Sequence, residues 1–479
     1  MERDDGDETA GLWAAYSKAV DYLGRLNGSA VAASLDAAAL RARFRRPLPP
    51  RGLPTKQVID ELTCDAAGGL VGSAGGRFFG WVIGGTLPAA LAADWLVSAW
   101  DQNAALNACS PAAAAVEEVA GEWLKELLAL PLDSSFAFVT GCQMAHVVCL
   151  AAARQELLLK RNHDVASKGM GGAPKIRILA NENCHASITR AANLLGFGTA
   201  NIGRIATDQL GSVKISAVQQ ALREQQDLAT ILVLQAGNIA TGSYDDFTAV
   251  IPLAKAMGAW VHIDGAFGLW AAASDRYRHL LSGVEAADSW ATDGHKVLNT
   301  PFDSGYAFVA HPDAHKAVFS LRASYLTHSN DERDQIDWNP DWSRRARGFP
   351  TYAAIRALGR DGVADLFEGY CRHTTALVNG LRSIPGVEVV SEPIVNQALV
   401  RFPDPTPGSG EEEHAARTDN VIVAINATGE AFFTGATWRG CRVMRISVCN
   451  WRTNEGDIER ACAAVSTALR SVESGIRQE

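Results

Sequence analysis

Short apolar runs that alternate with helical patterns constrain the fold of this chain more than any other feature. Seven such runs occupy residues 136–140, 176–180, 201–206, 230–235, 260–264, 289–293 and 306–310. Between several of them, apolar residues recur with helical spacing, as in residues 143–160 and 215–226. Buried β-branched runs separated by amphipathic helices predict an α/β fold with a mostly parallel seven-stranded sheet, covered by helices on both faces.

The 479 residues divide into three regions. Residues 1–100 form an N-terminal arm with helical patterns, and residues 101–345 form a large α/β domain. Residues 346–479 predict a small α+β domain. In that last region we expect one long helix at 351–384, strands at 386–390, 398–402, 421–426 and 443–449, a surface loop at 403–416 and a helix at 456–474.

Charge and composition exclude several partner classes. The formal net charge is −9, which makes duplex nucleic acid an unsuitable partner. The longest weakly polar stretch, residues 78–93, is shorter than the roughly 20 residues of a membrane span. The N-terminus is acidic and polar, the opposite of a signal peptide. Nine cysteines without CxxC pairs predict buried free thiols in a reducing compartment, so we expect a cytoplasmic protein without membrane or nucleic-acid partners.

Polar and small residues follow five of the predicted strands, and parallel strands bring their C-terminal ends to one sheet edge. These residues are Gly141, Cys142 and Gln143; Asn183, Cys184 and His185; Gly237 and Asn238; Asp264, Gly265 and Ala266; and Asp293, Gly294, His295 and Lys296. A lysine in such a cleft suits Schiff-base chemistry, because desolvation lowers its pKa. We expect no metal site.

Two motifs carry a family resemblance. HIDGAFG begins at His262, DGHKVLNTPFDSGYAFV begins at Asp293, and 32 positions separate Asp264 from Lys296. They resemble the group II pyridoxal phosphate (PLP) decarboxylases, which include the glutamate and aromatic-L-amino-acid decarboxylases. The resemblance extends from about Phe78 into the C-terminal domain and includes ASYLTH around Tyr325. It implies fold type I of the PLP-dependent transferases, and an obligate homodimer with active sites at the interface.

The resemblance also implies a role for each site residue. Lys296 resembles the lysine that holds PLP covalently, and Asp264 the carboxylate that keeps the pyridine nitrogen protonated. Ala266 would pack on one face of the ring and His185 on the other. The remaining cofactor contacts would come from Gly141, Cys142, Gln143, Asn238, Asp293 and His295, with backbone N–H groups at the start of the following helix facing the phosphate.

Three positions depart from the family pattern. Gln143 stands in place of the usual Ser or Thr, Asn238 in place of a frequent Thr, and Asp293 in place of a frequent Asn. Asp293 would repel phosphate unless it is turned away or protonated. Taken one at a time, the motifs also have purely structural explanations, such as a helix N-cap at residues 140–143. Their joint occurrence at one sheet edge favours the PLP site.

Tyr325 bears on the reaction. It lies 29 positions beyond Lys296 and matches the loop tyrosine that delivers a proton after CO₂ leaves; members with Phe there tend toward aldehyde synthesis. We therefore expect catalysis by Lys296, Asp264, His185 and Tyr325, with decarboxylation of an L-amino acid to an amine. Aldehyde synthesis, carbon–carbon lyase or aldolase chemistry and a non-catalytic homologue stay open as alternatives. Phe79 and Trp81 suggest an apolar pocket wall, hence an aromatic or aliphatic substrate.

Overall fold

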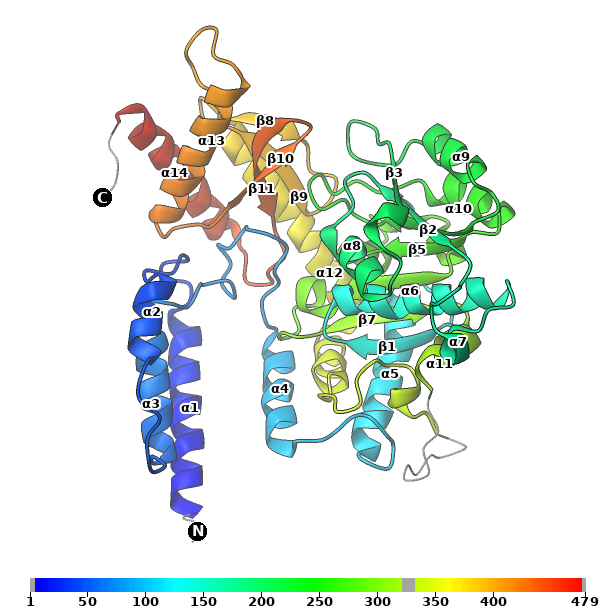
Figure 1. Ribbon diagram of the computed structural model, residues 1–479. Helices are drawn as coiled ribbons and strands as arrows, with labels where there is room; N and C mark the ends of the chain where they lie inside the picture. The colour runs from blue at the N-terminus through cyan, green and yellow to red at the C-terminus, as the bar shows by residue number, and fades with distance from the viewer. Residues whose placement is uncertain (1–4, 321–331, 476–479) are drawn as a thin grey trace.

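The computed structural model describes residues 5–320 and 332–475. Its centre is a seven-stranded sheet in the order β1-β7-β6-β5-β4-β2-β3 (Figure 1). The strands are β1 Ser135–Val139, β2 Ile176–Asn181, β3 Ile202–Ile205, β4 Ala229–Gln235, β5 Trp260–Asp264, β6 Ser289–Asp293 and β7 Gly305–Val309. Strand β7 runs antiparallel to β1 and β6, and the other pairs are parallel. The predicted mostly parallel sheet is confirmed, with each strand end within one residue of its expected position.

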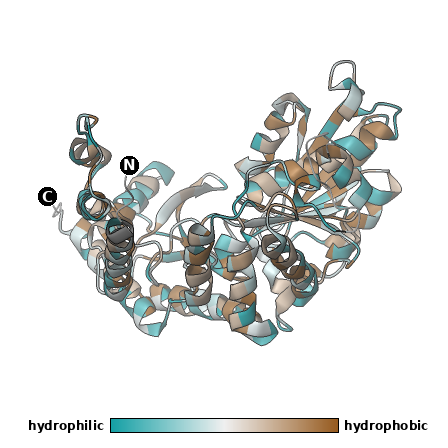
Figure 2. Ribbon diagram, turned by 90° about the horizontal axis from the view of Figure 1, so that it is seen from below, coloured by the Kyte–Doolittle hydropathy of each residue, from teal (hydrophilic) through white to brown (hydrophobic). Residues whose placement is uncertain are grey.

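Helices cover both faces of this sheet, which explains why every strand except the edge strand β3 is buried along its whole length. In β4, Ile231 and Val233 join the core that α6 and α8 cover, whereas Leu232 and Leu234 join the core that α5 and α10 cover. The helices of the large domain are α5 Pro111–Leu127, α6 Cys142–Leu159, α7 Val165–Lys168, α8 Ala186–Leu194, α9 Ile215–Arg223, α10 Phe247–Ala256 and α11 Pro312–Phe319. Figure 2 shows that hydrophilic and hydrophobic residues are both present on the helices of the molecule.

The small C-terminal domain differs from expectation at two elements: one expected strand is part of a helix, and the strand at 434–438 was not predicted. Its antiparallel sheet has the order β10-β11-β9-β8 and packs with α13 and α14. The bounds are β8 Glu388–Ser391, β9 Gln397–Arg401, α13 Glu411–Ala427, β10 Thr434–Trp438, β11 Cys441–Ser447 and α14 Glu455–Glu473. The predicted strand at 421–426 is wrong, because these residues lie inside α13. Glutamates in the first turn of α13 favour a helix start at residue 411, within the expected loop.

The long helix between the two domains, α12 (Gly348–Arg382), is interrupted. Gly359 has φ +65° and ψ −179°, so two helical segments meet at this residue. Glycine adopts such positive φ values without the steric penalty of a side chain. The prediction of one continuous helix is therefore wrong at Gly359.

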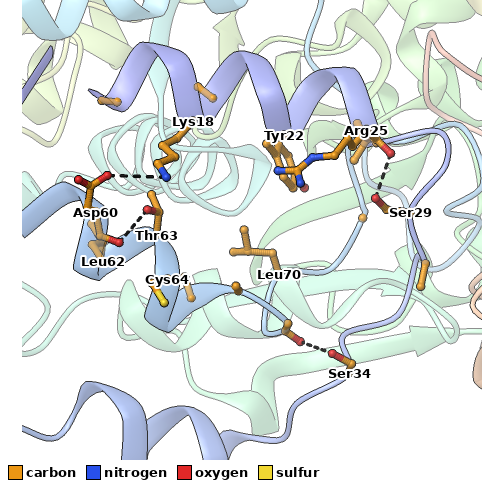
Figure 3. A pocket seen from close by; sticks show the side chains of 18 of the residues that line it. Lys18, Tyr22, Arg25, Ser29, Ser34, Asp60, Leu62, Thr63, Cys64 and Leu70 are labelled. Carbon is orange, nitrogen blue, oxygen red and sulfur yellow. Dashed lines mark hydrogen bonds and ion pairs between the residues drawn. The ribbon is translucent and has the colours of Figure 1, made fainter. Parts of the chain in front are cut away.

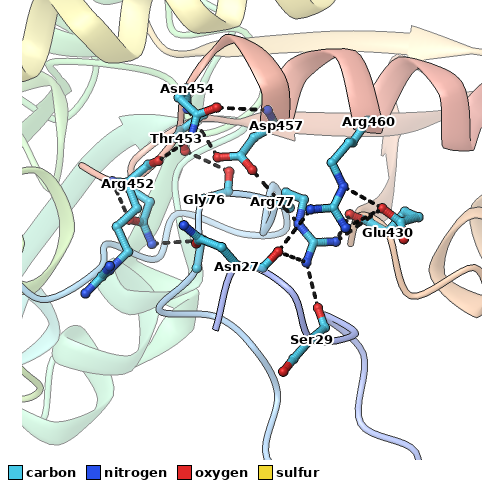
Figure 4. Close-up of polar contacts among 12 residues, drawn as sticks. Asn27, Ser29, Gly76, Arg77, Glu430, Arg452, Thr453, Asn454, Asp457 and Arg460 are labelled. Carbon is cyan, nitrogen blue, oxygen red and sulfur yellow. Dashed lines mark hydrogen bonds and ion pairs between the residues drawn. The ribbon is translucent and has the colours of Figure 1, made fainter. Parts of the chain in front are cut away.

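The N-terminal arm is tied to the C-terminal domain by a buried arginine. The arm contains α1 Asp5–Arg25, α2 Ala37–Phe44 and α3 Thr55–Ala66, and α4 Pro88–Trp100 follows it. The Arg77 guanidinium donates to the carbonyl oxygens of Ser29 at 2.6 Å, Asn27 at 3.0 Å and Glu430 at 2.6 Å (Figure 4). Its Nε also lies 4.0 Å from Asp457 of α14. We call these contacts the Arg77 clamp.

All nine cysteines lie in the described ranges and are free thiols. Cys142, Cys149, Cys371 and Cys449 are buried, whereas Cys64 and Cys109 are exposed, so the expectation of burial holds only in part. No helix within the described ranges is both long enough and hydrophobic enough to cross a bilayer.

Candidate active site

Parallel strand ends and the loops after them enclose a cavity of about 400 Å³ at the C-terminal edge of the sheet. The register explains the convergence: Asp264 on β5 lies level with Gln235 on β4 and Ala291 on β6. The cavity lining contains most of the expected cofactor-contacting residues, namely Gly141, Cys142, Gln143, His185, Asp264, Ala266, Asp293, His295 and Lys296. The structure therefore brings together side chains that are more than 150 positions apart in the sequence.

Lys296 lies in the tight turn 294–298 directly after β6. Its Nζ is 2.9 Å from Asp293 Oδ2. Burial disfavours the charged ammonium, but the negative charges of Asp293 and Asp264 outweigh burial and raise the pKa of Lys296 above its ordinary value. The expected lowering of this pKa is wrong, because a carboxylate stands three positions before the lysine and pairs with it.

Asp293 also accepts a hydrogen bond from the backbone N–H of Cys142, a group that we expected to face the phosphate. Burial alone would raise the pKa of Asp293, but the nearby Lys296 and His295 hold it below its usual value. Its Oδ1 accepts the backbone N–H of Cys142 at 2.5 Å and lies 3.5 Å from His295 Nε2. Gln143, the next residue of α6, lines the same cavity and directs its side-chain amide to Ser187 O at 3.3 Å.

Asp264 ends β5 with its side chain almost entirely buried, at 6% exposure of the residue. Three groups contact its Oδ1: Ala266 N–H at 3.3 Å, His146 Nε2 at 3.6 Å and Cys142 Sγ at 3.9 Å. Because these contacts share one oxygen, Oδ2 is the atom left to bind a ligand in the cavity.

His185 lies at the N-cap of α8, where its ring bonds to the following turn. The Ser187 N–H donates to His185 Nδ1 at 3.3 Å, and the Ser187 hydroxyl lies 2.8 Å from the same atom. Burial lowers the pKa of His185, with a further lowering from the charge of Lys296. A neutral ring that accepts at Nδ1 carries its proton on Nε2, so His185 can donate one hydrogen bond through Nε2.

Asn238 and Tyr325 stand apart from this group. Asn238 is buried but absent from the cavity lining, since its Oδ1 accepts the Ala240 N–H at 2.9 Å and stabilises its own turn. The neighbouring Gly237 and Ile239 line the cavity instead. Tyr325 lies outside the described residues.

Arg445 is a candidate that the sequence analysis missed. It lies on β11 and is only 9% exposed, and its Nε and Nη2 have no hydrogen-bond partner among the described residues. Its positive charge helps to lower the pKa of His185, although Arg445 is not among the residues that line the cavity. A charged residue inside the apolar run VMRISVC was the available signal, because an unpaired buried charge is costly without a functional reason.

The apolar wall also differs from expectation. Phe79 is buried against Phe433, with ring centroids 5.2 Å apart, and Trp81 is 51% exposed beside Phe432. Neither residue lines the cavity, whose large apolar side chains are Ile239, Phe267 and Phe302. The segment after Phe79 instead contacts the turn at 294–298 that contains Lys296, where Gly84 N–H donates to His295 O at 3.3 Å. A Cβ at Gly84 would collide with Lys296 O.

The residues present fit PLP. Lys296 offers an amine for a covalent link, Asp264 Oδ2 a buried acceptor for the ring nitrogen, and Ala266 a small side chain beside it. A Cβ at Gly141 would lie 3.0 Å from His295 Cε1, so a larger residue in the loop before α6 would require the His295 ring to shift. Potential metal-binding atoms of Cys142, His146 and Asp264 lie within 4.8 Å of one another, but they include the carboxylate that the ring nitrogen requires.

Comparisons with known proteins agree with this geometry. The model of the pyridoxal-dependent decarboxylase conserved domain matches residues 40–402. Tryptophan decarboxylase 1 of Oryza sativa subsp. japonica is 28% identical over 459 residues, covering 89% of this chain and 87% of that protein. Phenylacetaldehyde synthase of a Rosa hybrid cultivar is 27% identical over 386 residues, covering 76% and 74%. The crystal structure of Oryza sativa TDC with PLP and tryptamine has a TM-score of 0.91 at 22% identity, covering 98% of this chain and 99% of that one. With the family match spanning most of the sequence, this chain belongs to the pyridoxal-dependent decarboxylases, and its cofactor is PLP.

Proposed function

We propose that this enzyme removes the α-carboxyl group of an L-amino acid with an apolar side chain and releases the amine. The proposal rests on the meeting of Lys296, Asp264 and His185 in one cavity whose other walls include Ile239 and Phe302. PLP, when bound, withdraws electrons from the bonds of the substrate α-carbon, which lets CO₂ leave. The protein has to hold the cofactor and substrate, exclude water and supply a proton.

Each of the central side chains has one task in this proposal. Lys296 binds the cofactor covalently through Nζ, which requires the neutral amine. Asp264 accepts the proton-bearing ring nitrogen at Oδ2 and balances its charge. His185 would contact the cofactor ring and donate through Nε2 to the substrate carboxylate, and the guanidinium of Arg445 would attract the same carboxylate. A carboxylate that binds both a guanidinium and an imidazole N–H is restricted in orientation, which favours breaking the bond between the α-carbon and the carboxyl group.

The substrate class can be tested by measuring CO₂ release from each of the twenty amino acids. We expect the highest kcat/KM with aromatic or aliphatic side chains, because the cavity offers them Ile239, Phe267 and Phe302. A methylene group in an apolar pocket contributes roughly tenfold or more to discrimination. Highest kcat/KM with glutamate or aspartate would contradict the proposed specificity and leave the decarboxylation itself intact.

Aldehyde synthesis is the second candidate, because phenylacetaldehyde synthase is among the relatives. In that reaction the amino acid, O₂ and H₂O give the aldehyde, CO₂, NH₃ and H₂O₂. Amine release consumes no O₂, since a proton replaces the carboxyl group. Which reaction occurs therefore depends on whether the α-carbon receives a proton before it meets O₂.

Tyr325 is the residue that we propose for this proton transfer, by its sequence position alone. The Tyr325→Phe variant should lose amine formation by about 10²-fold, a usual contribution of a positioned general acid. Part of the remaining flux should produce aldehyde and peroxide in equal amounts. Amine, aldehyde and H₂O₂ are measured together, with O₂ uptake as a control. Stoichiometric peroxide from the wild-type enzyme would favour the aldehyde synthase instead, and unchanged amine formation in the variant would point to another donor.

Asp293 should make cofactor loading depend on pH. The pKa of Lys296 is raised, so only a small fraction of the amine is neutral near pH 7, and this fraction grows about tenfold per pH unit. At saturating PLP, the rate of covalent loading of the apoenzyme should therefore increase steadily from pH 7 to pH 9. In Asp293→Asn the neutral fraction is larger, so loading should be faster and level off at lower pH. Stopped-flow absorbance measures both profiles, and identical profiles would contradict the role of the carboxylate.

We propose that the enzyme is a homodimer assembled through its N-terminal helices. Large apolar side chains are exposed on α1 and α3, namely Leu12, Trp13, Tyr16, Val20, Val58 and Leu62. An adjoining cavity of about 860 Å³ lies between the two helices, bordered by Tyr22, Leu62 and Leu70 (Figure 3). Clustered exposed apolar side chains are typical of protein interfaces. Sedimentation equilibrium should give twice the chain mass, and Trp13→Asp should shift the protein toward the monomer; a monomeric wild type would contradict the proposal.

The nine free thiols support a reducing compartment, and we propose the cytoplasm.

A further inference from the structure

Beside Asp264, a buried chain of hydrogen bonds leads from His146 into the interior of the large domain. Trp260 Nε1 and His262 Nδ1 each lie 2.9 Å from the Ser289 hydroxyl oxygen. On the other side of the same ring, His262 Nε2 is 2.9 Å from His146 Nδ1. His146 Nε2 then lies 3.4 Å from Cys142 Sγ and 3.6 Å from Asp264 Oδ1, the second being slightly longer than a hydrogen bond. His146, His262 and Ser289 have no exposed surface.

The donor chemistry gives the chain a direction. An indole N–H can only donate, so the Ser289 oxygen accepts from Trp260; in the arrangement that we infer, the Ser289 hydroxyl donates its own proton to His262 Nδ1. His262 then carries its ring proton on Nε2 and donates to His146 Nδ1. His146 in turn carries its proton on Nε2, the atom that faces Asp264. Burial lowers the pKa of both histidines, which agrees with two neutral rings.

We propose that His146 is a positioning residue that donates its Nε2 proton to Asp264 Oδ1 and so keeps Oδ2 directed at the cofactor's ring nitrogen. This inference rests on the role proposed above for Asp264. Within a nearly waterless site, a hydrogen-bond donor stabilises a carboxylate strongly and restricts its rotation. Without that donor, Asp264 would hold its negative charge less firmly and would turn more freely. The ring nitrogen would then lose its proton more readily.

The other groups around Asp264 cannot replace His146. Cys142 Sγ lies 3.9 Å from Oδ1, and a thiol is a weak donor. The Ala266 N–H donates to the same oxygen, Oδ1, from the backbone two residues further along the chain. His185, Cys184 and Lys296 also act on Asp264 through their charges or dipoles, and all of them remain in place when His146 is changed.

The test uses holoenzyme loaded with PLP that carries ¹⁵N in the pyridine ring, because the ¹⁵N shift reports directly whether the nitrogen is protonated. The wild type should keep the proton from about pH 7 to pH 9, whereas His146→Leu should begin to lose it within that range. The dissociation constant of PLP should rise about tenfold in His146→Leu. His146→Gln is the matched control: its amide can place an N–H near the position of Nε2, so both properties should return toward the wild-type values.

Two further variants separate the possible failures. Asp264→Asn must change the ¹⁵N shift if the proposed function is correct; if it does not, the assignment of Asp264 fails. If Asp264→Asn changes the shift and His146→Leu leaves both shift and affinity unchanged, the positioning role of His146 is overturned. Should His146→Leu not fold, Ser289→Ala removes the hydroxyl proton that faces His262 without changing a ring. It should move the ¹⁵N titration in the same direction by a smaller amount, and an unchanged titration would likewise overturn the role.

Discussion

Replacing Lys296 by alanine should lower turnover by about 10⁴-fold or more, because the covalent hold on the cofactor is lost. Borohydride reduction of the wild-type holoenzyme followed by peptide mapping should place the pyridoxyl group on Lys296. The reduced Lys296→Ala protein should carry no such adduct. Lys296 is the lysine that lines the cavity, and Nζ is within 2.9 Å of a carboxylate that orients it.

Lys316→Ala serves as the matched control. Lys316 lies on α11 and is paired with Asp337 at 3.4 Å, away from the cavity lining. This variant should keep its turnover and its adduct on Lys296. An adduct on a different lysine of freshly loaded wild-type enzyme would contradict the proposed site.

Asp264→Asn should reduce kcat by about 10²-fold or more while the protein stays folded. The substitution keeps the shape of the side chain but removes the charge that balances the protonated ring nitrogen, and such electrostatic groups commonly contribute this much. The KM for substrate should change far less than kcat, because Asp264 faces the ring nitrogen rather than the substrate. Steady-state kinetics and a thermal melt of the same preparation measure both effects. Near-normal kcat in a fully loaded variant would mean that another group protonates the ring.

Asn238→Ala is a useful comparison for this variant. The side-chain amide of Asn238 accepts the Ala240 N–H within its own turn and lies outside the cavity. We therefore expect a loss of stability of about 1 kcal/mol from the missing hydrogen bond, with kcat within a few-fold of the wild-type value.

The sheet could be predicted from the sequence because its strands are buried on both faces and bounded by turns. The same reasoning failed at 421–426, since a short apolar run has the same composition in a buried strand and on the inner side of a helix. At 421–426 the residues before the apolar run determine the structure, because the glutamates from 411 onward favour the start of α13. The break at Gly359 depends on the positive φ angle of this residue, which the helical pattern of the neighbouring residues does not indicate.

The sequence predicted which side chains lie at the cavity where a residue follows a strand closely, as for Asp264 and Lys296, and missed or misplaced side chains whose position depends on tertiary contacts. Asp264 and Lys296 are placed by their strands alone. Asn238 occupies an equivalent position after β4, but its side chain bonds to its own turn. Arg445 and His146 come from a different domain and from inside a helix, so their nearness to the site depends on packing that no local pattern encodes. The raised pKa of Lys296 likewise depends on which atoms of Asp293 it meets.

The Arg77 clamp has a consequence for the order in which the protein matures. Arg77 lies 352 positions before Gly429, a further carbonyl partner, so the partners in the C-terminal domain leave the ribosome long after Arg77 does. At about 5–20 residues per second, this interval is roughly 20–70 seconds. Throughout it, the buried guanidinium has its carbonyl partners at Asn27 and Ser29 but not those at Glu430 and Asp457. The N-terminal helices, with the apolar side chains proposed for dimerisation, therefore gain their fixed orientation only when synthesis is nearly complete. We therefore expect pairing between nascent chains to follow the synthesis of the domain that carries Arg445.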